Sequence, residues 1–210
     1  MSPARPTGAG RVVVAIDGPA GSGKSTLSRA LAARLGVQRL DTGAMYRSVA
    51  WAVLQRGVDP GDPDAVADVA RTLELEVGDR GVAEGTDITE AIRGPEVSAA
   101  VSAVAANPAV RAVMVDRQRD WVTTHGGGVV EGRDIGSVVL PDARLKLYLD
   151  ASPEVRAARR SEEGAEAVAR RDRLDSTRAA SPLEVPDGAR VIDTGAHSVD
   201  EIVEQVLTWL

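Results

Sequence analysis

The stretch Arg11-Val12-Val13-Val14-Ala15-Ile16-Asp17-Gly18-Pro19-Ala20-Gly21-Ser22-Gly23-Lys24-Ser25 decides the fold of this 210-residue chain. It begins with a nearly unbroken β-branched run, residues 11–16, which is typical of a strand buried on both faces of a parallel sheet. A glycine-rich loop follows at once. From Ser25 to Leu35 apolar residues recur at helical spacing, and Gly36 is placed to end that helix. The stretch therefore predicts a strand, a loop and a helix in direct succession.

The loop matches the pattern G-x-x-x-x-G-K-[ST] through Gly18, Gly23, Lys24 and Ser25. Glycines let the backbone curl so that successive N–H groups point at phosphate oxygens, and the following helix adds its positive end. Lys24 is placed to bridge the outer phosphates, and the Ser25 hydroxyl is a suitable ligand for a magnesium ion. We therefore expect the loop to hold the polyphosphate of ATP, with magnesium as the cofactor. The expected nucleotide-binding residues are Gly18, Pro19, Ala20, Gly21, Ser22, Gly23, Lys24, Ser25 and Thr26.

Two other interpretations of these glycines are weaker. A dinucleotide-binding fingerprint would place its third glycine at Thr26, which disfavours that site. A glycine-rich turn with an accidental lysine is disfavoured because a buried strand precedes the loop and a helix follows it. The role of Asp17 stays open, because its carboxylate is placed either to hold magnesium-bound waters or to bond amides of the loop.

The composition limits the class of protein. We expect one domain with a disordered tail at Met1 to Gly10. The absence of cysteine and the presence of two separated histidines exclude disulfides, thiolate metal sites and a histidine metal cluster. We find no secretion signal and no membrane-spanning stretch, which indicates a cytoplasmic protein without a membrane partner. The net charge of −6 argues against nucleic acid as a partner, and a monomer is the default expectation.

Strand and helix patterns alternate along the chain, which predicts an α/β fold with a doubly wound parallel sheet. The predicted helices are 25–35, 45–56 and 108–125, with a glycine triplet at 126–128 ending the third, and the further strands are 129–130, 145–150 and 191–192. Ser198 and Glu201 form a capping box that predicts the start of a terminal helix.

The middle of the chain interrupts this alternation. Leu73 to Val77 alternates apolar with acidic residues, and a turn at 78–81 leads to a partner strand at 82–84. We therefore predict a small inserted subdomain at 60–106, within a core domain formed by 11–59 and 107–210.

Nearly all positive charge is arginine, because lysine occurs only at Lys24 and Lys146. Ser152 and Pro153 predict the start of a helix that leads into a late arginine cluster. Guanidinium groups bind phosphate oxygens bidentately, so the cluster indicates a local polyanion site, although a solvated helix face is the alternative. The cluster comprises Arg159, Arg160, Arg170, Arg171 and Arg173.

A guanine-nucleotide switch is excluded by missing motifs. Such a switch needs an asparagine-lysine pair followed one residue later by aspartate, whereas the only asparagine here, Asn107, precedes Pro108, and no D-x-x-G stretch occurs. A kinase for a phosphorylated acceptor needs several arginines to offset repulsion between its two anionic substrates, and the cluster supplies them. That acceptor already presents an oxyanion nucleophile, so His125 and His197 are expected to be ordinary surface residues.

Three further motifs make the chain resemble the bacterial cytidylate kinases, which are nucleoside monophosphate kinases. They are Asp41-Thr42-Gly43-Ala44-Met45-Tyr46-Arg47, Glu131-Gly132-Arg133-Asp134-Ile135-Gly136, and Arg171-Asp172-Arg173-Leu174-Asp175-Ser176-Thr177-Arg178 followed by Ser181-Pro182-Leu183. The resemblance runs from about Val12 to the carboxyl terminus. It implies a P-loop kinase fold with a nucleoside-monophosphate-binding insert and a short lid at 156–178.

The resemblance also implies roles for individual residues. Lys24, Arg159 and Arg178 would neutralise charge during transfer of the ATP γ-phosphoryl group to CMP or dCMP, and Ser25 would hold magnesium. Cytosine offers a carbonyl, a ring nitrogen and an amine, so it needs donors and a carboxylate acceptor. The implied acceptor residues are Thr42, Tyr46, Arg47, Ser102, Arg111, Arg133, Asp134, Arg171, Asp175 and Arg178. Another small-acceptor P-loop kinase and a nucleotide-binding regulator without turnover are the alternatives.

Overall fold

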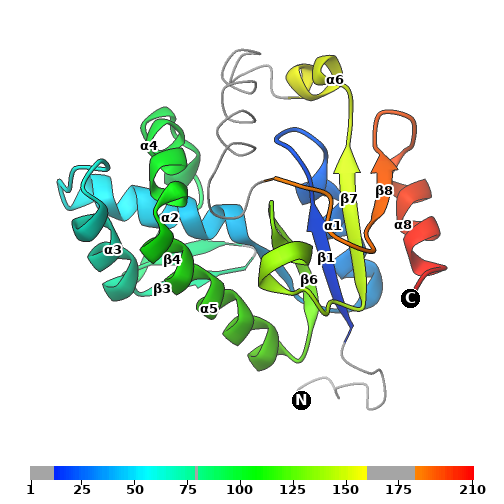
Figure 1. Ribbon diagram of the computed structural model, residues 1–210, viewed down its shortest axis with the longest axis horizontal. Coiled ribbons are helices and arrows are strands. Elements are labelled where there is room, and N and C mark those ends of the chain that lie inside the picture. The colour runs from blue at the N-terminus through cyan, green and yellow to red at the C-terminus, as the bar shows by residue number, and fades with distance from the viewer. Residues whose placement is uncertain (1–11, 79, 160–182) are drawn as a thin grey trace.

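A five-stranded parallel sheet organises the chain in the computed structural model, which describes residues 12–78, 80–159 and 183–210 (Figure 1). Across the sheet the strands run in the order β2-β6-β1-β7-β8, and all four neighbouring pairs are parallel. Their bounds are Arg39–Asp41 for β2, Gly128–Glu131 for β6, Val13–Asp17 for β1, Leu145–Asp150 for β7 and Arg190–Asp193 for β8. β2 and β6 lie on one side of β1, and β7 and β8 lie on the other. The strand order therefore changes direction at β1, and ligands of such sheets bind near the carboxyl end of the strand where this happens.

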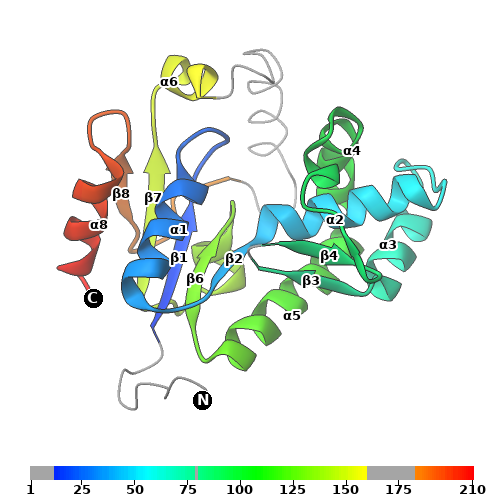
Figure 2. The ribbon, with the colours of Figure 1, turned by 180° about the vertical axis from the view of Figure 1, so that it is seen from behind.

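Alternate residues of the sheet face two different helical layers. Val14 and Ile16 of β1 pack against helices α1 (Lys24–Leu35) and α8 (Val199–Leu207), which lie together on one face, as Figure 2 shows. Ala15, between them, faces the opposite layer. This period of two, with apolar residues on both faces, explains why the β-branched run at the start of the chain forms a central strand.

The opposite layer contains four helices and a small antiparallel sheet in one continuous apolar core with Ala15, Leu40 and Val130 of the main sheet. The helices are α2 (Thr42–Gln55), α3 (Pro63–Thr72), α4 (Pro95–Ala106) and α5 (Pro108–His125). The small sheet has the order β3 (Leu75–Val77), β4 (Gly81–Ala83), β5 (Thr86–Asp87), and a 3-10 turn, η1 (Ala91–Arg93), follows it.

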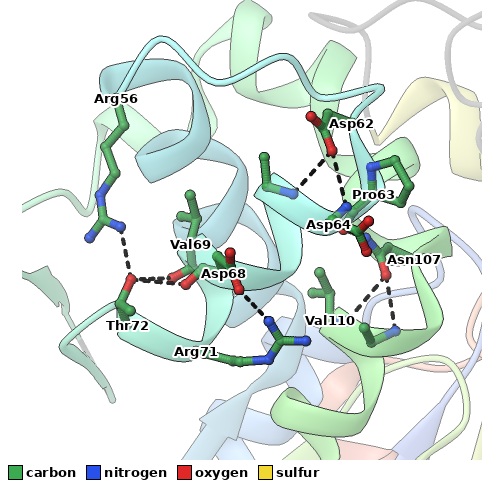
Figure 3. A network of polar contacts seen from close by, with 12 residues as sticks. Arg56, Asp62, Pro63, Asp64, Asp68, Val69, Arg71, Thr72, Asn107 and Val110 are labelled. Carbon is green, nitrogen blue, oxygen red and sulfur yellow. Dashed lines mark hydrogen bonds and ion pairs between the residues drawn. The ribbon is translucent and has the colours of Figure 1, made fainter.

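Side-chain caps begin both α3 and α5, as Figure 3 shows, and one of them also links the two helices. Asp62 accepts hydrogen bonds from the amides of Asp64 and Ala65 at the start of α3. Asn107 caps α5 in the same way, and its amide group also donates to the Pro63 carbonyl at 2.7 Å. A single asparagine therefore fixes the start of α5 against the start of α3.

Most of the predicted elements are confirmed, including the parallel α/β sheet, the antiparallel subdomain, the helix at 108–125 and the Ser198–Glu201 capping box. The boundaries of the insert at 60 and 106 stay a prediction. The expectation that the second helix begins at Met45 is wrong, because Asp41 caps the amide of Ala44 and the helix begins at Thr42. Gly128 also belongs to β6 rather than to the end of the preceding helix. The edge strand β2 was not predicted.

Two short helices complete the described fold. A π-helical turn, η2 (Ile135–Val139), follows β6, and α6 (Pro153–Ala158) follows β7 with Ser152 as its cap, as the sequence predicts. Among the described residues no single helix is long and apolar enough to cross a membrane. Helices α4 and α5 together reach that length and apolarity, but a bend of 93° separates them.

Candidate active site

Acidic and polar residues gather at the carboxyl ends of the central strands. Asp17 ends β1 and Glu131 ends the neighbouring β6, where Glu131 lies level with Ile16. On the other side of β6, Asp41 of β2 pairs in register with Glu131. In open α/β sheets ligands bind at this edge, at the point where the strand order reverses. The candidate site therefore lies above β2, β6 and β1.

The loop between β1 and α1 has the backbone shape that its glycines predict. Gly18, Gly21 and Gly23 have φ values of 146°, 77° and 89°, which L side chains rarely adopt. Gly23 lies at the N-terminus of α1, so the positive end of that helix faces the loop. This is the arrangement that binds phosphate oxygens through backbone amides.

Changing Gly18→Ala is expected to lower the free energy of unfolding by about 2 kcal/mol or more. The added Cβ would lie 2.2 Å from the Leu149 carbonyl oxygen, at a φ of 146°. Gly36→Ala is the control, because that residue also has a positive φ of 65° but meets no atom within 4 Å, and it should cost about 1 kcal/mol. Urea unfolding measures both, and equal losses would contradict the steric argument.

Lys24 lies inside the loop, with 8% of its surface exposed. Its Nζ donates to the carbonyls of Gly18 at 2.8 Å and Pro19 at 2.7 Å. Burial raises the pKa of both Asp17 and Glu131, and the charge of Lys24 opposes that rise. A buried ammonium at the loop attracts further anionic oxygens.

Glu131 is a candidate site residue that the sequence places in a motif without indicating a role. It is 2% exposed, and its carboxylate accepts hydrogen bonds from Ser25 Oγ at 2.9 Å, Ser28 Oγ at 2.8 Å and Arg39 Nη1 at 2.8 Å. Burial raises its pKa, and the charge of Asp41 adds to this effect. Its place directly after a buried strand was the signal that could have identified it.

Asp17 makes a contact that the sequence did not indicate. Its Oδ1 and Oδ2 accept hydrogen bonds from the amides of Ile135 and Gly136, each at 2.7 Å. The partners are amides, but they belong to η2 rather than to the phosphate loop. Burial raises the pKa of Asp17 to about 6.

On the acceptor side, the structure brings Arg111 and Asp134 together. These residues, from α5 and from the segment after β6, form an ion pair in which each residue is 5% exposed. The guanidinium of Arg111 also lies over the ring of Tyr46, 5.6 Å from its centre. Ser102 lies half-buried on α4. Burying two charges is costly unless they are paired, so the pair is held in place by its surroundings.

Three other predicted residues lie between the strand ends and the small subdomain. Thr42 Oγ1 donates to the Glu131 carbonyl at 2.7 Å. Arg47, one turn further along α2, donates to the Ile92 carbonyl at 3.1 Å and to Ser98 Oγ at 3.0 Å. Arg133 is half-buried directly before Asp134.

Arg159 lies beside the phosphate loop, although it follows β7 by nine residues. Its Nη1 donates to Thr194 Oγ1 at 2.8 Å and approaches the Gly21 carbonyl at 3.5 Å. Thr194 in turn donates to the Ser22 carbonyl at 3.0 Å. The other predicted residues of the lid, Arg171, Asp175 and Arg178, lie outside the described residues, as does most of the arginine cluster.

The described residues contain no group of three or more histidine, cysteine, aspartate or glutamate side chains that could hold a metal ion. His125 and His197 are exposed, as expected of surface residues. A magnesium ion bound by one or two protein oxygens and by substrate phosphates needs no such group.

Known proteins resemble this chain over nearly its full length. The cytidylate kinase family model matches residues 14–210. Cytidylate kinases from Mycobacterium leprae and Streptomyces avermitilis are each 48% identical, over 93% and 94% of this chain and 94% and 91% of theirs. A solved structure of an uncharacterised protein from Eubacterium ventriosum shares the fold, with a TM-score of 0.52 and 11% identity over 95% of this chain and 98% of that one. The chain therefore belongs to the cytidylate kinase family.

Proposed function

We propose that this protein transfers the γ-phosphoryl group of ATP to CMP or dCMP, giving ADP and CDP or dCDP. The observation that carries the proposal is the placement of a phosphate loop and a buried Arg111–Asp134 pair at adjoining strand ends of one sheet. The first binds a polyphosphate, and the second has the chemistry to recognise a base. Adjoining strand ends thus offer a site to each of two nucleotides.

On the donor side, the loop amides and Lys24 bind the ATP phosphates. Arg159 adds a second cation from the far side of the loop, because its guanidinium is held there by Thr194. Phosphoryl transfer requires little covalent chemistry from the protein, so positioning and neutralisation of charge supply most of the catalysis. Arg178 is assigned a similar role by family resemblance.

Ser25 and Glu131 fit the requirements of a magnesium site. A hydroxyl and a carboxylate lie 2.9 Å apart beside the loop, and magnesium prefers a small number of oxygen ligands with several waters. In the proposed arrangement Ser25 would be a ligand of the ion, and the Glu131 carboxylate would orient the Ser25 hydroxyl and the waters. The ion would offset the negative charge of the ATP phosphates.

On the acceptor side, Asp134 accepts a hydrogen bond from the cytosine amine, while Arg111 and Ser102 donate to its ring nitrogen and carbonyl. Arg47, Arg133 and Arg178 bind the acceptor phosphate. Thr42 and Tyr46 also contact the acceptor nucleotide. Arg171 and Asp175 are assigned the ribose by family resemblance. The acceptor phosphate is already an oxyanion, so the reaction needs no general base.

A coupled assay of ADP release with CMP, dCMP, UMP, AMP and shikimate tests the proposal. We expect CMP and dCMP to give the highest kcat/KM. ATP binding without acceptor-dependent ADP release would instead indicate a regulator, and preference for a different acceptor would indicate another small-acceptor kinase.

Changing Ser25→Ala is expected to raise the magnesium concentration needed for half-maximal activity about tenfold, because a direct oxygen ligand is lost. Ser28→Ala is the matched control, since Ser28 bonds the same carboxylate from one helical turn further on. Calorimetry of ATP binding with and without magnesium gives a second readout. Equal effects of the two variants would contradict the assignment of Ser25.

A further inference from the structure

Asp17 forms the cap of a helical turn that is more than a hundred residues away in the chain. Its two carboxylate oxygens accept hydrogen bonds from the first two amides of η2, those of Ile135 and Gly136, each at 2.7 Å. The Asp17 residue is completely buried. Helical turns leave their first amides without partners inside the turn, so an external carboxylate satisfies both.

This contact changes what Asp134 is able to do. Asp134 immediately precedes η2, and an aspartate in that position ordinarily accepts hydrogen bonds from the amides of the turn. Here Asp134 makes no such cap, and its Oδ2 pairs with Arg111 instead. Because Asp17 satisfies the amides of the turn, the Asp134 carboxylate is available to the base pocket.

The same segment of β1 joins the two halves of the site. The carbonyl of Ile16 accepts a hydrogen bond from the Gly132 amide at 2.9 Å, and Gly18 begins the phosphate loop directly after Asp17. Two consecutive residues of β1 thus hold both ends of the short segment that carries Arg133 and Asp134. Those bonds connect the donor loop to the acceptor pocket through backbone that is fully buried.

We propose that Asp17 is a positioning residue for the acceptor nucleotide, which fixes the backbone of residues 135–136 and thereby directs the Asp134 carboxylate to the cytosine. The inference rests on the role proposed above for Asp134. It requires no contact between Asp17 and either substrate.

Changing Asp17→Asn tests the inference, because the amide keeps one acceptor oxygen but turns an NH2 group toward the second backbone N–H. We expect the KM for CMP to rise about tenfold, while the KM for ATP changes less than about twofold. Asp150→Asn is the control, since Asp150 also ends a sheet strand and accepts an amide hydrogen bond, but from Ala151 rather than from residues 132–139. A KM for CMP that stays within twofold of the wild type would overturn the inference.

A double-mutant cycle separates this inference from the proposed function. If Asp17 acts through Asp134, then Asp17→Asn should change the KM for CMP less than about twofold when Asp134→Asn is already present. Fully additive effects would show that Asp17 acts by another route. If Asp134→Asn alone leaves the KM for CMP unchanged, the base-reading assignment fails, whatever Asp17 does.

The wild-type protein provides a test if Asp17→Asn does not fold. The pKa of Asp17 is raised to about 6, mainly by burial. The amide hydrogen bonds from Gly136 and Ile135 and the charge of Lys24 oppose this rise, and the charge of Asp134 adds to it. Tyr148 of β7 also lies within reach of the Asp17 charge. A protonated carboxyl group accepts fewer hydrogen bonds, so the acceptor pocket should weaken as the pH falls through 6. The probe is cytidine, which carries no phosphate to titrate. Its dissociation constant should rise about threefold from pH 7.5 to about pH 5.5, and a constant value would overturn the inference.

Discussion

Phosphoryl transfer is expected to fall about 10²–10³-fold when Lys24 is changed to alanine, because one preorganised cation is removed from the transferring phosphoryl group. Lys24 is buried in the loop, with its Nζ bonded to the carbonyls of Gly18 and Pro19. Its charge therefore acts in a site that excludes water, where it is worth more than at the surface. Steady-state kinetics with CMP and ATP measure the loss as a fall in kcat.

The other lysine of the chain serves as the control. Lys146→Ala removes a cation that donates to the Asp187 carbonyl near the opposite end of β7 and should leave kcat within about twofold. Circular dichroism should show that Lys24→Ala keeps its fold, because the hydrogen bonds described for the Lys24 side chain join it to residues of the loop and not to the sheet. A folded Lys24→Ala protein with a near-normal rate would contradict the assigned role.

Local patterns in the sequence predicted the parts of the fold that depend on neighbouring residues. The strand before the loop, helix α1 and the capping box at Ser198 each follow from spacing within about ten residues. The start of α2 was placed three residues late, because the capping role of Asp41 outweighs the weak helix propensity of Thr42 and Gly43.

The contacts that organise the site could not be predicted from local sequence patterns. Ser25 and Glu131 are separated by 106 residues, and Asp17 and Ile135 by 118. These contacts depend on β1 and β6 being neighbours in register, which no local pattern encodes. Arg39 was missed for a related reason, because its strand has only three residues and its side chain matters only through the pairing of β2 with β6.

The family resemblance implied that Arg111 and Asp134 read the base, and the structure adds that they form a buried ion pair. Because the pair is buried, breaking it has two consequences. A lone buried guanidinium costs about 3–5 kcal/mol of folding free energy, and the base pocket loses its carboxylate. Any experiment on this pair must therefore separate stability from recognition.

Changing Asp134→Ala is expected to raise the KM for CMP about 10–100-fold, since a hydrogen bond to a charged acceptor is lost from a buried pocket. ATP affinity should change less than about twofold, because the hydrogen bond and ion pair described for the Asp134 side chain go to Arg111 and not to the donor loop. The exposed Asp142→Ala, eight residues further along the chain, is the control for removal of a carboxylate. Parallel losses of CMP and ATP affinity would show that the variant damages the whole site and would remove the base-reading assignment.

A second variant separates the two consequences. Replacing both partners, with Arg111→Met and Asp134→Leu, removes the uncompensated charge, so the free energy of unfolding should return toward the wild-type value. Use of CMP should remain as poor as in Asp134→Ala, because the pocket still lacks a carboxylate. Added CMP should then raise the Tm of the wild type but not that of the double variant, since a ligand stabilises only a state that binds it. Recovery of CMP binding together with stability would mean that the pair serves the fold and that cytosine is recognised elsewhere.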